Sequence, residues 1–301
     1  MTLPSGYLYS TTYAGIRKAV KDDLSLIVSQ TPATSAAVFT QNRVQAAPVR
    51  LAKANLKASK GLVSAVLINA GNANCATRTG DKVALETTRA LAKTLGFAAN
   101  QVVPASTGVI GVELNPKLIV KALPKLTKSL RMDAFEQVAG AIMTTDTVPK
   151  MATAELSAGT GVVRMAGLTK GAGMIMPNMA TTLAFVMTDA KIAQPVLQKM
   201  LKTAVDASFN RLSIDGDTST NDTLLVMANG TSGVNVDSKL QPLFAEALTK
   251  LLQDLAIQMA RDGEGAKKLV TINVTGAATN DDATRIARHC EFAAGEDGHP
   301  R

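Results

Sequence analysis

The chain has 301 residues, 46% of them hydrophobic, which is enough for one large or two modest domains with a buried core. Its net charge is +8, but the basic residues are scattered singly among acidic ones, and only seven phenylalanines and three tyrosines offer aromatic rings. Because nucleic-acid binders cluster basic residues and often present stacking surfaces, we exclude that class. A basic protein that handles small anionic substrates accounts for the charge.

Short β-branched runs alternate with longer helical patterns along the chain. In chain order, the sequence predicts strands at Ser35–Thr40, Leu62–Asn69, Val102–Ser106, Gly161–Ala166, Leu183–Met187, Leu224–Ala228 and Leu269–Val274. It predicts helices at Asp81–Leu95, Asp133–Met143, Ala193–Ser208 and Lys239–Arg261. This alternation predicts an α/β fold in which layers of sheet and helix pack together.

The cysteine content and the hydrophobic runs indicate a soluble cytoplasmic protein. Two cysteines, Cys75 and Cys290, are too few for a disulfide framework and suggest a reducing compartment. The N-terminus lacks a basic segment followed by an apolar one, so we expect no signal peptide. The apolar run Leu62–Ala70 is too short to span a membrane.

The most informative segment reads K-G-A-G-M-I-M-P-N-M-A-T-T-L-A-F at 170–185. Its glycines and proline bend the backbone ahead of Ala180–Thr181, and the β-prone run Leu183–Met187 follows. A threonine at the start of a strand can attack the carbonyl of the preceding residue. Hydrolysis of the resulting ester leaves an N-terminal threonine whose own amine acts as base. Thr181 and Thr182 are the candidates for this nucleophile, although an isolated A-T-T would be read as an ordinary turn.

Seven further motifs accompany this segment in a fixed order. They are A-G-I at 14–16, A-V-F-T at 37–40, I-N-A-G-N-A-N at 68–74, A-S-T-G-V-I-G at 105–111, I-M-T-T-D-T-V-P-K at 142–150, F-N-R-L-S-I-D-G-D-T-S-T-N-D-T at 209–223 and A-R-D-G-E-G-A-K-K at 260–268. With 170–185 they resemble the ornithine acetyltransferase family, also called bifunctional glutamate N-acetyltransferase, of arginine biosynthesis. The resemblance extends from Ala14 to Arg288.

The resemblance implies both a fold and a reaction. The expected fold has sheets packed face to face between helical layers, with the cleavage site at their junction. The family pattern favours Thr181 as nucleophile, so cleavage at Ala180–Thr181 would give an α chain, 1–180, and a β chain whose N-terminal part is 181–288. The expected reaction moves an acetyl group from N-acetylornithine to glutamate through an acetyl-threonine, without a cofactor and with acetyl-CoA as an alternative donor. Two α and two β chains would form a heterotetramer.

The motif at 105–111 follows a predicted strand and ends in a flexible turn. The Thr107 hydroxyl and the Gly108 N–H can stabilise a developing oxyanion, and one such donor is worth roughly 3–4 kcal/mol. An ordinary strand-ending turn would explain the same residues on their own. The family resemblance assigns them to the oxyanion hole.

The resemblance also implies three contacts with the substrate. Lys170 would bind its carboxylate, a role that suits a point charge on a flexible stem. Glu264, in D-G-E-G-A after a long predicted helix, would contact its amino end. Thr144 is the third predicted contact, with Thr145 and Thr147 as alternatives in the same motif.

The remaining polar residues allow other functional interpretations. The stretch D-G-D-T-S-T-N-D at 215–222 has Thr220 and Val226 where an EF-hand loop needs Gly and Glu. An Asp-nucleophile magnesium phosphatase is kept as an alternative, although a turn held by Asx hydrogen bonds is favoured. The cysteines and histidines lack zinc-ligand spacing, so no metal is expected, and Cys75 is interpreted as a packed thiol rather than a nucleophile. An amidase or aminopeptidase with an N-terminal nucleophile is the nearest alternative function.

The residues from His289 onward depart abruptly from the family pattern. Codons able to encode them read I-A-N-S-P-L-V-K-T-A one nucleotide later, which is the continuation expected in the family. We interpret 289–301 as an out-of-frame tail on a C-terminally truncated chain, and resequencing codons 285–301 tests this. The family's later substrate ligands would then be missing, and reduced activity of this chain is expected.

Overall fold

The computed structural model describes residues 1–159, 161–175 and 182–296, with side chains described up to residue 290. The chain divides into a large unit, Met1–Glu264, and a small unit, Gly265–Arg301, and each is described by itself. Among the described residues, no helix combines the length and apolarity needed to cross a membrane.

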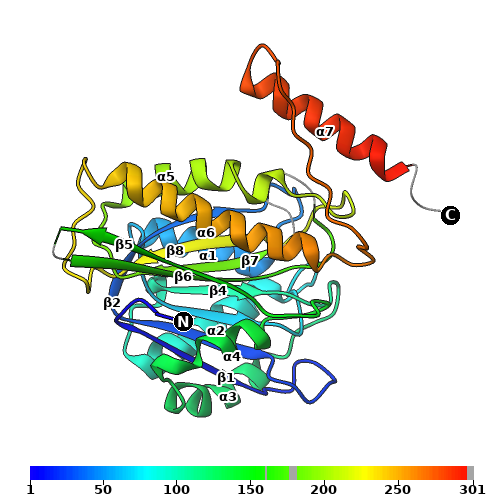
Figure 1. Ribbon diagram of the computed structural model, residues 1–301. Coiled ribbons are helices and arrows are strands. Elements are labelled where there is room, and N and C mark those ends of the chain that lie inside the picture. Colours follow the sequence, from blue (N-terminus) through cyan, green and yellow to red (C-terminus); the bar gives the residue numbers. More distant parts are fainter. Residues whose placement is uncertain (160, 176–181, 297–301) are drawn as a thin grey trace. The chain divides into compact units, whose positions relative to one another are not determined.

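The large unit is built on one mixed sheet (Figure 1). Its described strands are β1 (Tyr7–Thr12), β2 (Leu24–Phe39), β3 (Leu62–Asn69), β4 (Val102–Ser106), β5 (Lys150–Ala158), β6 (Gly161–Lys170), β7 (Leu183–Thr188) and β8 (Thr223–Ala228). Hydrogen bonds order them β4-β3-β2-β8-β7-β6-β5, and β1 pairs with β2. The β3–β4 and β7–β8 pairs are parallel, and the other pairs are antiparallel.

The long strand β2 divides this sheet into two halves. Its first part, Leu24–Val28, pairs with both β1 and β3, whereas its last part, 34–39, pairs with β8. The register with β3 shifts between Val28 and Ala33. Such an irregularity bends a strand and increases its twist, which lets the half with β1, β3 and β4 fold over the half with β5–β8.

The two halves enclose an inner hydrophobic core. Tyr7 and Tyr9 of β1 and Phe185 of β7 are buried there. The Tyr7 hydroxyl lies 2.7 Å from the carbonyl oxygen of Met227 and 3.0 Å from that of Thr188, so it connects β1 with β8 and β7. The halves therefore lie face to face, as the resemblance implied, but β2 joins them into one continuous hydrogen-bonded sheet rather than two separate sheets.

Helices cover the outer face of each half (Figure 1). α5 (Gln194–Asp206) and α6 (Gln241–Arg261) pack on the half with β5–β8, and α2 (Gly80–Leu95) and α3 (Pro116–Lys128) pack on the other. The alternation of side chains along β3 explains this layering. Ala65 and Leu67 belong to the helix-covered core, and Val66 and Ile68 belong to the inner core. The large unit is a four-layer α/β sandwich.

Two further α-helices lie in the described part of the large unit. α1 (Ala47–Ala58) packs against β4. α4 (Phe135–Ala141) lies beside β1, where the Phe135 ring meets Tyr9 edge-on with the ring centroids 5.3 Å apart. Edge-to-face packing is a preferred geometry for aromatic pairs, and here it closes one side of the inner core.

The predicted elements of the large unit are confirmed, several with shifted ends. β3 and β4 have the predicted bounds, and the strand predicted at Ser35–Thr40 is the last part of β2. The sequence predictions missed β1, β5, α1 and α3. β5 reads K-M-A-T-A-E-L-S-A, and its small and polar residues give a weak hydrophobic pattern. The predicted chain boundary at Ala180–Thr181 lies outside the described residues.

The small unit contains the helix α7 (Asn280–Glu296). Thr279 accepts a hydrogen bond from the Asp282 N–H at 3.1 Å, and its hydroxyl lies 2.7 Å from the Asp282 carboxylate, which caps the helix start. The strand predicted at Leu269–Val274 is wrong: this segment is not a strand. Leu269 is 46% exposed, and the described part of this unit offers no second strand for it to pair with. The out-of-frame interpretation of 289–301 stays a prediction.

Candidate active site

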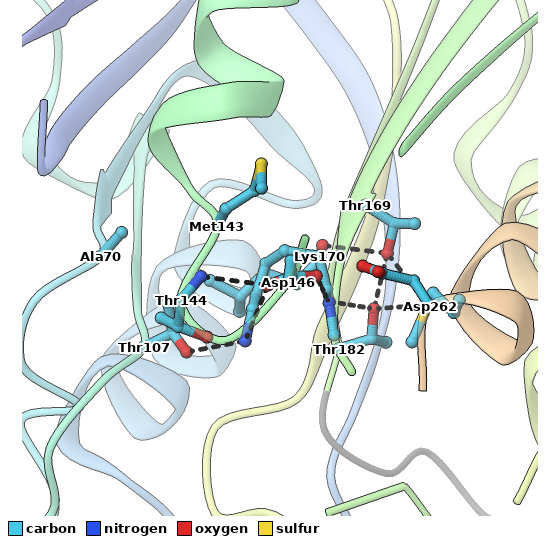
Figure 2. A network of polar contacts seen from close by, with 12 residues as sticks. Ala70, Thr107, Met143, Thr144, Asp146, Thr169, Lys170, Thr182 and Asp262 are labelled. Carbon is cyan, nitrogen blue, oxygen red and sulfur yellow. Dashed lines mark hydrogen bonds and ion pairs between the residues drawn. The ribbon is translucent and has the colours of Figure 1, made fainter. Parts of the chain in front are cut away.

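The candidate site lies where the two halves of the sheet meet at their strand ends. Thr107 follows β4 in one half, and Lys170 ends β6 in the other. Figure 2 shows the Lys170 ammonium donating to the Thr107 hydroxyl oxygen across 3.3 Å. Two residues that are 63 positions apart are therefore in direct contact. This places two of the predicted site residues together at the junction between the halves.

In the turn Thr107–Gly108, the backbone conformation and the close approach of Gly71 require a glycine at position 108. The Thr107 N–H continues the β3–β4 ladder by donating to the Asn69 carbonyl at 2.8 Å. Gly108 has φ +124°, and a Cβ there would lie 2.5 Å from the carbonyl carbon of Gly71. A side chain would therefore collide with backbone and force an unfavourable φ. Gly108 is exposed, and its oxyanion role, like that of Thr107, stays a prediction.

Asparagines of the motif at 68–74 support this turn. The Asn69 side chain accepts from the N–H of Gly71 at 2.9 Å and donates to the Asn72 carbonyl at 2.6 Å. Asn221, from the 209–223 motif, donates to the carbonyls of Ala73 and Ser106 at 2.7 and 2.8 Å. These buried amides satisfy carbonyl groups of the loop and of the end of β4. The sequence motifs contained these residues, but spacing alone assigned them no role.

Lys170 is almost completely buried, with 4% of its surface exposed. Burial lowers its pKa because the charged form loses its hydration. Asp146, whose Oδ2 lies 4.0 Å from the ammonium nitrogen, opposes that shift most strongly. Asp222 and Glu264 also oppose it, whereas Lys150 adds to it. The predicted substrate-binding lysine is thus desolvated, and its protonation depends on its charged neighbours.

Asp146, which the sequence did not single out, joins several parts of the site. Its Oδ1 accepts from the Lys150 ammonium at 2.7 Å and from the Gly171 N–H at 2.6 Å. Its Oδ2 accepts from the Thr144 N–H at 3.0 Å (Figure 2). Burial would raise the pKa of Asp146, but the charge of Lys170 and these hydrogen bonds outweigh it and hold the pKa below its usual value. Asp146 is therefore a buried, ionised carboxylate.

Lys150 extends this network to the end of α6. It is fully buried and donates to the Asp262 carboxylate at 2.5 Å as well as to Asp146. Asp262 also accepts from the N–H of Thr147 at 3.0 Å. The 142–150 motif is thus held between the end of β6 and the end of α6. Such a network is typical of a site that needs fixed geometry.

The predicted contacts Thr144 and Glu264 lie at the exposed rim of the large unit. The Glu264 N–H donates to the Ala172 carbonyl at 2.6 Å. Its carboxylate lies against Gly173, where a Cβ would approach the carboxyl carbon to 2.8 Å. Glu264 is therefore held beside the segment that follows Lys170. Its proposed contact with a substrate amine, and that of Thr144 with the substrate, stay predictions.

Thr182 is buried, and its hydroxyl is engaged by protein groups. The hydroxyl lies 2.7 Å from that of Thr169 and donates to the Lys170 carbonyl at 3.1 Å (Figure 2). Its N–H donates to the Asp222 carboxyl at 2.9 Å. These contacts suit a structural threonine better than a nucleophile, which weakens the competing candidate. Thr181, the predicted nucleophile, lies outside the described residues.

Asp222 stands at the start of β8 and is also buried. Burial raises its pKa well above the usual value, although the Thr182 N–H and the charge of Lys170 act in the opposite direction. Burial therefore favours the neutral form of the Asp222 carboxyl. The two buried carboxyl groups that influence Lys170 thus differ: the pKa of Asp146 is lowered, whereas that of Asp222 is raised.

Two of the alternative assignments can be compared with the geometry. The Asp215 carboxylate accepts from the Asp217 N–H at 3.2 Å, as in an Asx turn, and also from the Ile175 N–H at 2.8 Å. Cys75 is buried beside Ala73 and Val49, as expected of a packed thiol. Among the described residues, no group of three His, Cys, Asp or Glu side chains could hold a metal ion.

A four-layer α/β sandwich with polar residues converging at the junction of its halves is the architecture of the Ntn-hydrolase fold. An L-aminopeptidase D-Ala-esterase/amidase from Ochrobactrum anthropi, described as a variant of that fold, has a TM-score of 0.52 over 87% of this chain and 88% of its own. At 10% identity, this likeness concerns the fold alone.

The chain belongs to the ArgJ family, whose model matches residues 8–292. The arginine biosynthesis bifunctional protein ArgJ of Nitratidesulfovibrio vulgaris is 46% identical over 286 residues, which cover 95% of this chain and 72% of that protein. The ArgJ crystal structure from Bacillus halodurans is 33% identical with a TM-score of 0.55, over 59% of this chain and 92% of that one.

A second solved relative is ornithine acetyltransferase from Mycobacterium tuberculosis, whose structure contains ornithine. It is 28% identical with a TM-score of 0.51, and the match covers 60% of this chain and 94% of that one. The family membership confirms the resemblance drawn from the ordered motifs. It gives no support to the phosphatase alternative.

Proposed function

We propose that this chain is an acetyltransferase of arginine biosynthesis that moves an acetyl group from N-acetylornithine to glutamate. Family membership and the names of the relatives support the class of reaction. The observation that carries the proposal is the 3.3 Å contact between Lys170 and Thr107. It brings a cation suited to a substrate carboxylate next to a hydroxyl suited to an oxyanion, at the junction of the two halves of the sheet.

Thr181 is the proposed nucleophile, and the transfer takes two steps. The Thr181 hydroxyl attacks the acetyl carbonyl of N-acetylornithine and gives its proton to the α-amine of the same residue. The tetrahedral oxyanion is stabilised by the Thr107 hydroxyl and the Gly108 N–H. Collapse breaks the amide bond, ornithine leaves with the proton, and an acetyl-threonine ester remains. The amine of glutamate then attacks this ester, forms N-acetylglutamate and restores the threonine.

The same site would bind both amino acids in turn. Lys170 binds the α-carboxylate, Glu264 contacts the amino end, and Thr144 provides a further polar contact. No bound cofactor is required, because the donor itself carries the acetyl group. Acetyl-CoA is an alternative donor, since its thioester can acylate the same threonine.

Self-cleavage at Ala180–Thr181 is proposed to create the N-terminal threonine. The proposal rests on the segment 170–185, which resembles the self-cleavage segment of the family. We further propose that two α and two β pieces assemble into a heterotetramer, which light scattering of the purified protein would test.

The decisive experiment incubates the purified protein with isotopically labelled N-acetylornithine and glutamate. Labelled N-acetylglutamate is the expected product, and ping-pong kinetics are expected because an acetyl-enzyme forms. A parallel reaction with acetyl-CoA decides whether the second donor is used. Release of labelled acetate without acetylation of glutamate would instead indicate an amidase, and the proposed function would be wrong.

A further inference from the structure

The buried carboxylate of Asp146 lies beside Lys170, the proposed carboxylate-binding residue, and Lys170 in turn contacts Thr107, the proposed oxyanion donor. It lies 4.0 Å from the Lys170 ammonium, and its hydrogen bonds fix the backbone on both sides of the site, at Thr144 and at Gly171. Lys150 fixes Asp146 in turn, at 2.7 Å. Asp146 itself has no exposed side-chain surface, so it cannot contact a substrate.

The charge state of Lys170 determines which way the Thr107 hydroxyl points. A protonated ammonium has only donors, so the Thr107 oxygen accepts at 3.3 Å and its own proton is directed elsewhere. A neutral amine would offer a lone pair and could take the Thr107 proton for itself. Only the charged form of Lys170 therefore leaves Thr107 free to donate to an oxyanion.

The groups that face Lys170 differ in how well they can maintain that charge. Lys150 is a cation and disfavours it. Burial raises the pKa of Asp222, which favours its neutral form, and Glu264 is exposed to solvent, where water screens its field. Asp146 is the buried neighbour with a full negative charge at short range. It exerts the largest stabilising effect on the protonated lysine.

We propose that Asp146 is a positioning residue that keeps Lys170 protonated and thereby holds the Thr107 hydroxyl oriented as an oxyanion donor. The inference rests on the proposed function for its catalytic consequence, but the link between Asp146 and Lys170 is independent of it. The network Asp146–Lys170–Thr107 supplies both carboxylate recognition and oxyanion stabilisation. Loss of the Asp146 charge should weaken both at the same pH.

The first test measures kcat and kcat/KM for N-acetylornithine between pH 6 and 10 in the protein and in Asp146→Asn. An opposite charge at 4–6 Å shifts a pKa by about 1–3 units, so the alkaline fall in activity should move down by at least about one unit. At the pH where the parent begins to lose activity, the variant should be about tenfold slower. Asp146→Glu restores the charge and should recover part of the shift.

Asp81→Asn is the matched control. It makes the same chemical change at an exposed ion pair with Arg50 and should leave the pH profile unchanged. A purely structural role for Asp146 would lower activity equally at every pH without moving the alkaline limb. That result, with melting temperatures close to the parent's, would overturn the proposal.

The second test does not depend on activity. Proteins carrying ¹³Cε-lysine are titrated by NMR, and the Lys170 signal is identified by its loss in Lys170→Arg. Lys170 should titrate at lower pH in Asp146→Asn than in the parent, with Asp146→Glu between them. An unchanged titration would refute the link. If the parent shows no acetyl transfer, the proposed function fails, yet this titration still decides whether Asp146 maintains the charge of Lys170.

Discussion

At the scale of single residues, Gly108 shows how tightly the proposed oxyanion turn is built. We predict that Gly108→Ala lowers the transfer rate by at least about tenfold, because its new Cβ would lie 2.5 Å from the Gly71 backbone at φ +124°. Strain of this kind costs about 1–3 kcal/mol, measurable as a fall in the free energy of unfolding in urea. Both quantities are measured on the same preparations.

Gly111 in the same turn provides the control for this prediction. It also has a positive φ, +79°, but an added Cβ would meet nothing within 4 Å. Gly111→Ala should therefore lose some stability from backbone strain while keeping most of the activity. Equal losses of activity in Gly108→Ala and Gly111→Ala would show that the collision of the new Cβ with the Gly71 backbone does not cause the loss of activity.

Asp222 gives a residue-scale prediction about pH. Its pKa is raised in the folded protein, whereas the unfolded carboxyl titrates near 3.9. The folded state therefore holds a proton that the unfolded state releases as pH rises above about 4. The free energy of unfolding therefore falls as the pH rises from about 4 to the pKa that Asp222 has in the folded protein. Asp222→Asn removes this loss and can still accept from the Thr182 N–H.

The measurement compares urea unfolding of the parent and Asp222→Asn at pH 5 and pH 8. The parent should lose more free energy of unfolding between the two pH values than the variant does. If the difference between the two proteins is the same at both pH values, the pKa of Asp222 is not raised in the folded protein and this prediction is wrong.

At the scale of elements, Lys150 connects the start of β5 with the end of α6. Replacing it by methionine leaves the carboxylates of Asp146 and Asp262 without their shared cation. Breaking a buried ion pair in this way typically costs about 3–5 kcal/mol. We therefore predict a large fall in the melting temperature of Lys150→Met, measured by circular dichroism.

Arg164 on the neighbouring strand β6 offers a matched comparison. It pairs with Glu155 of β5 at 3.2 Å, but both side chains are partly exposed. Surface pairs of this kind contribute at most about 1 kcal/mol, so Arg164→Met should change the melting temperature little. Similar falls in the melting temperatures of Lys150→Met and Arg164→Met would mean that burial does not determine how much the Lys150 ion pairs stabilise the fold.

The elements also show what the sequence could and could not predict. β3 and β4 were predicted with their true bounds because continuous apolar runs end at turn residues on both sides. The segment Leu269–Val274 has a similar pattern yet is not a strand, since pairing partners decide whether such a run becomes one. A local pattern carries no information about partners far away in the chain.

The same limit applies to the candidate site. Thr107 and Lys170 are predicted site residues because the motifs that contain them resemble motifs of the family to which roles in the reaction are assigned. The structure places the two residues in contact. Asp146 and Lys150 lie in the motif at 142–150, but only the fold reveals that they are buried together behind Lys170. Sequence spacing cannot show that Asp146, Lys150 at the start of β5 and Lys170 at the end of β6 are buried close together.

At the scale of the whole molecule, the proposed cleavage site falls between two adjacent strands of one sheet. Cleavage at Ala180–Thr181 would leave β6 in the α piece and β7 in the β piece, and these strands pair over six residues. β2 and β8 pair across the same division. The inner core also contains side chains from both pieces, including Tyr9 and Phe185. The two pieces would therefore share one sheet and one core.

We predict that the mature protein gives two masses under denaturing conditions but elutes as one species under native conditions. Separating the pieces would expose the paired edges of β2, β6, β7 and β8 and the apolar faces of the core, which is strongly unfavourable in water. Intact mass spectrometry and size-exclusion chromatography with light scattering make the measurement, and Thr181→Ala serves as the uncleaved control. A single mass corresponding to all 301 residues in the parent would refute cleavage. Two pieces that separate without denaturant would refute a shared sheet and core.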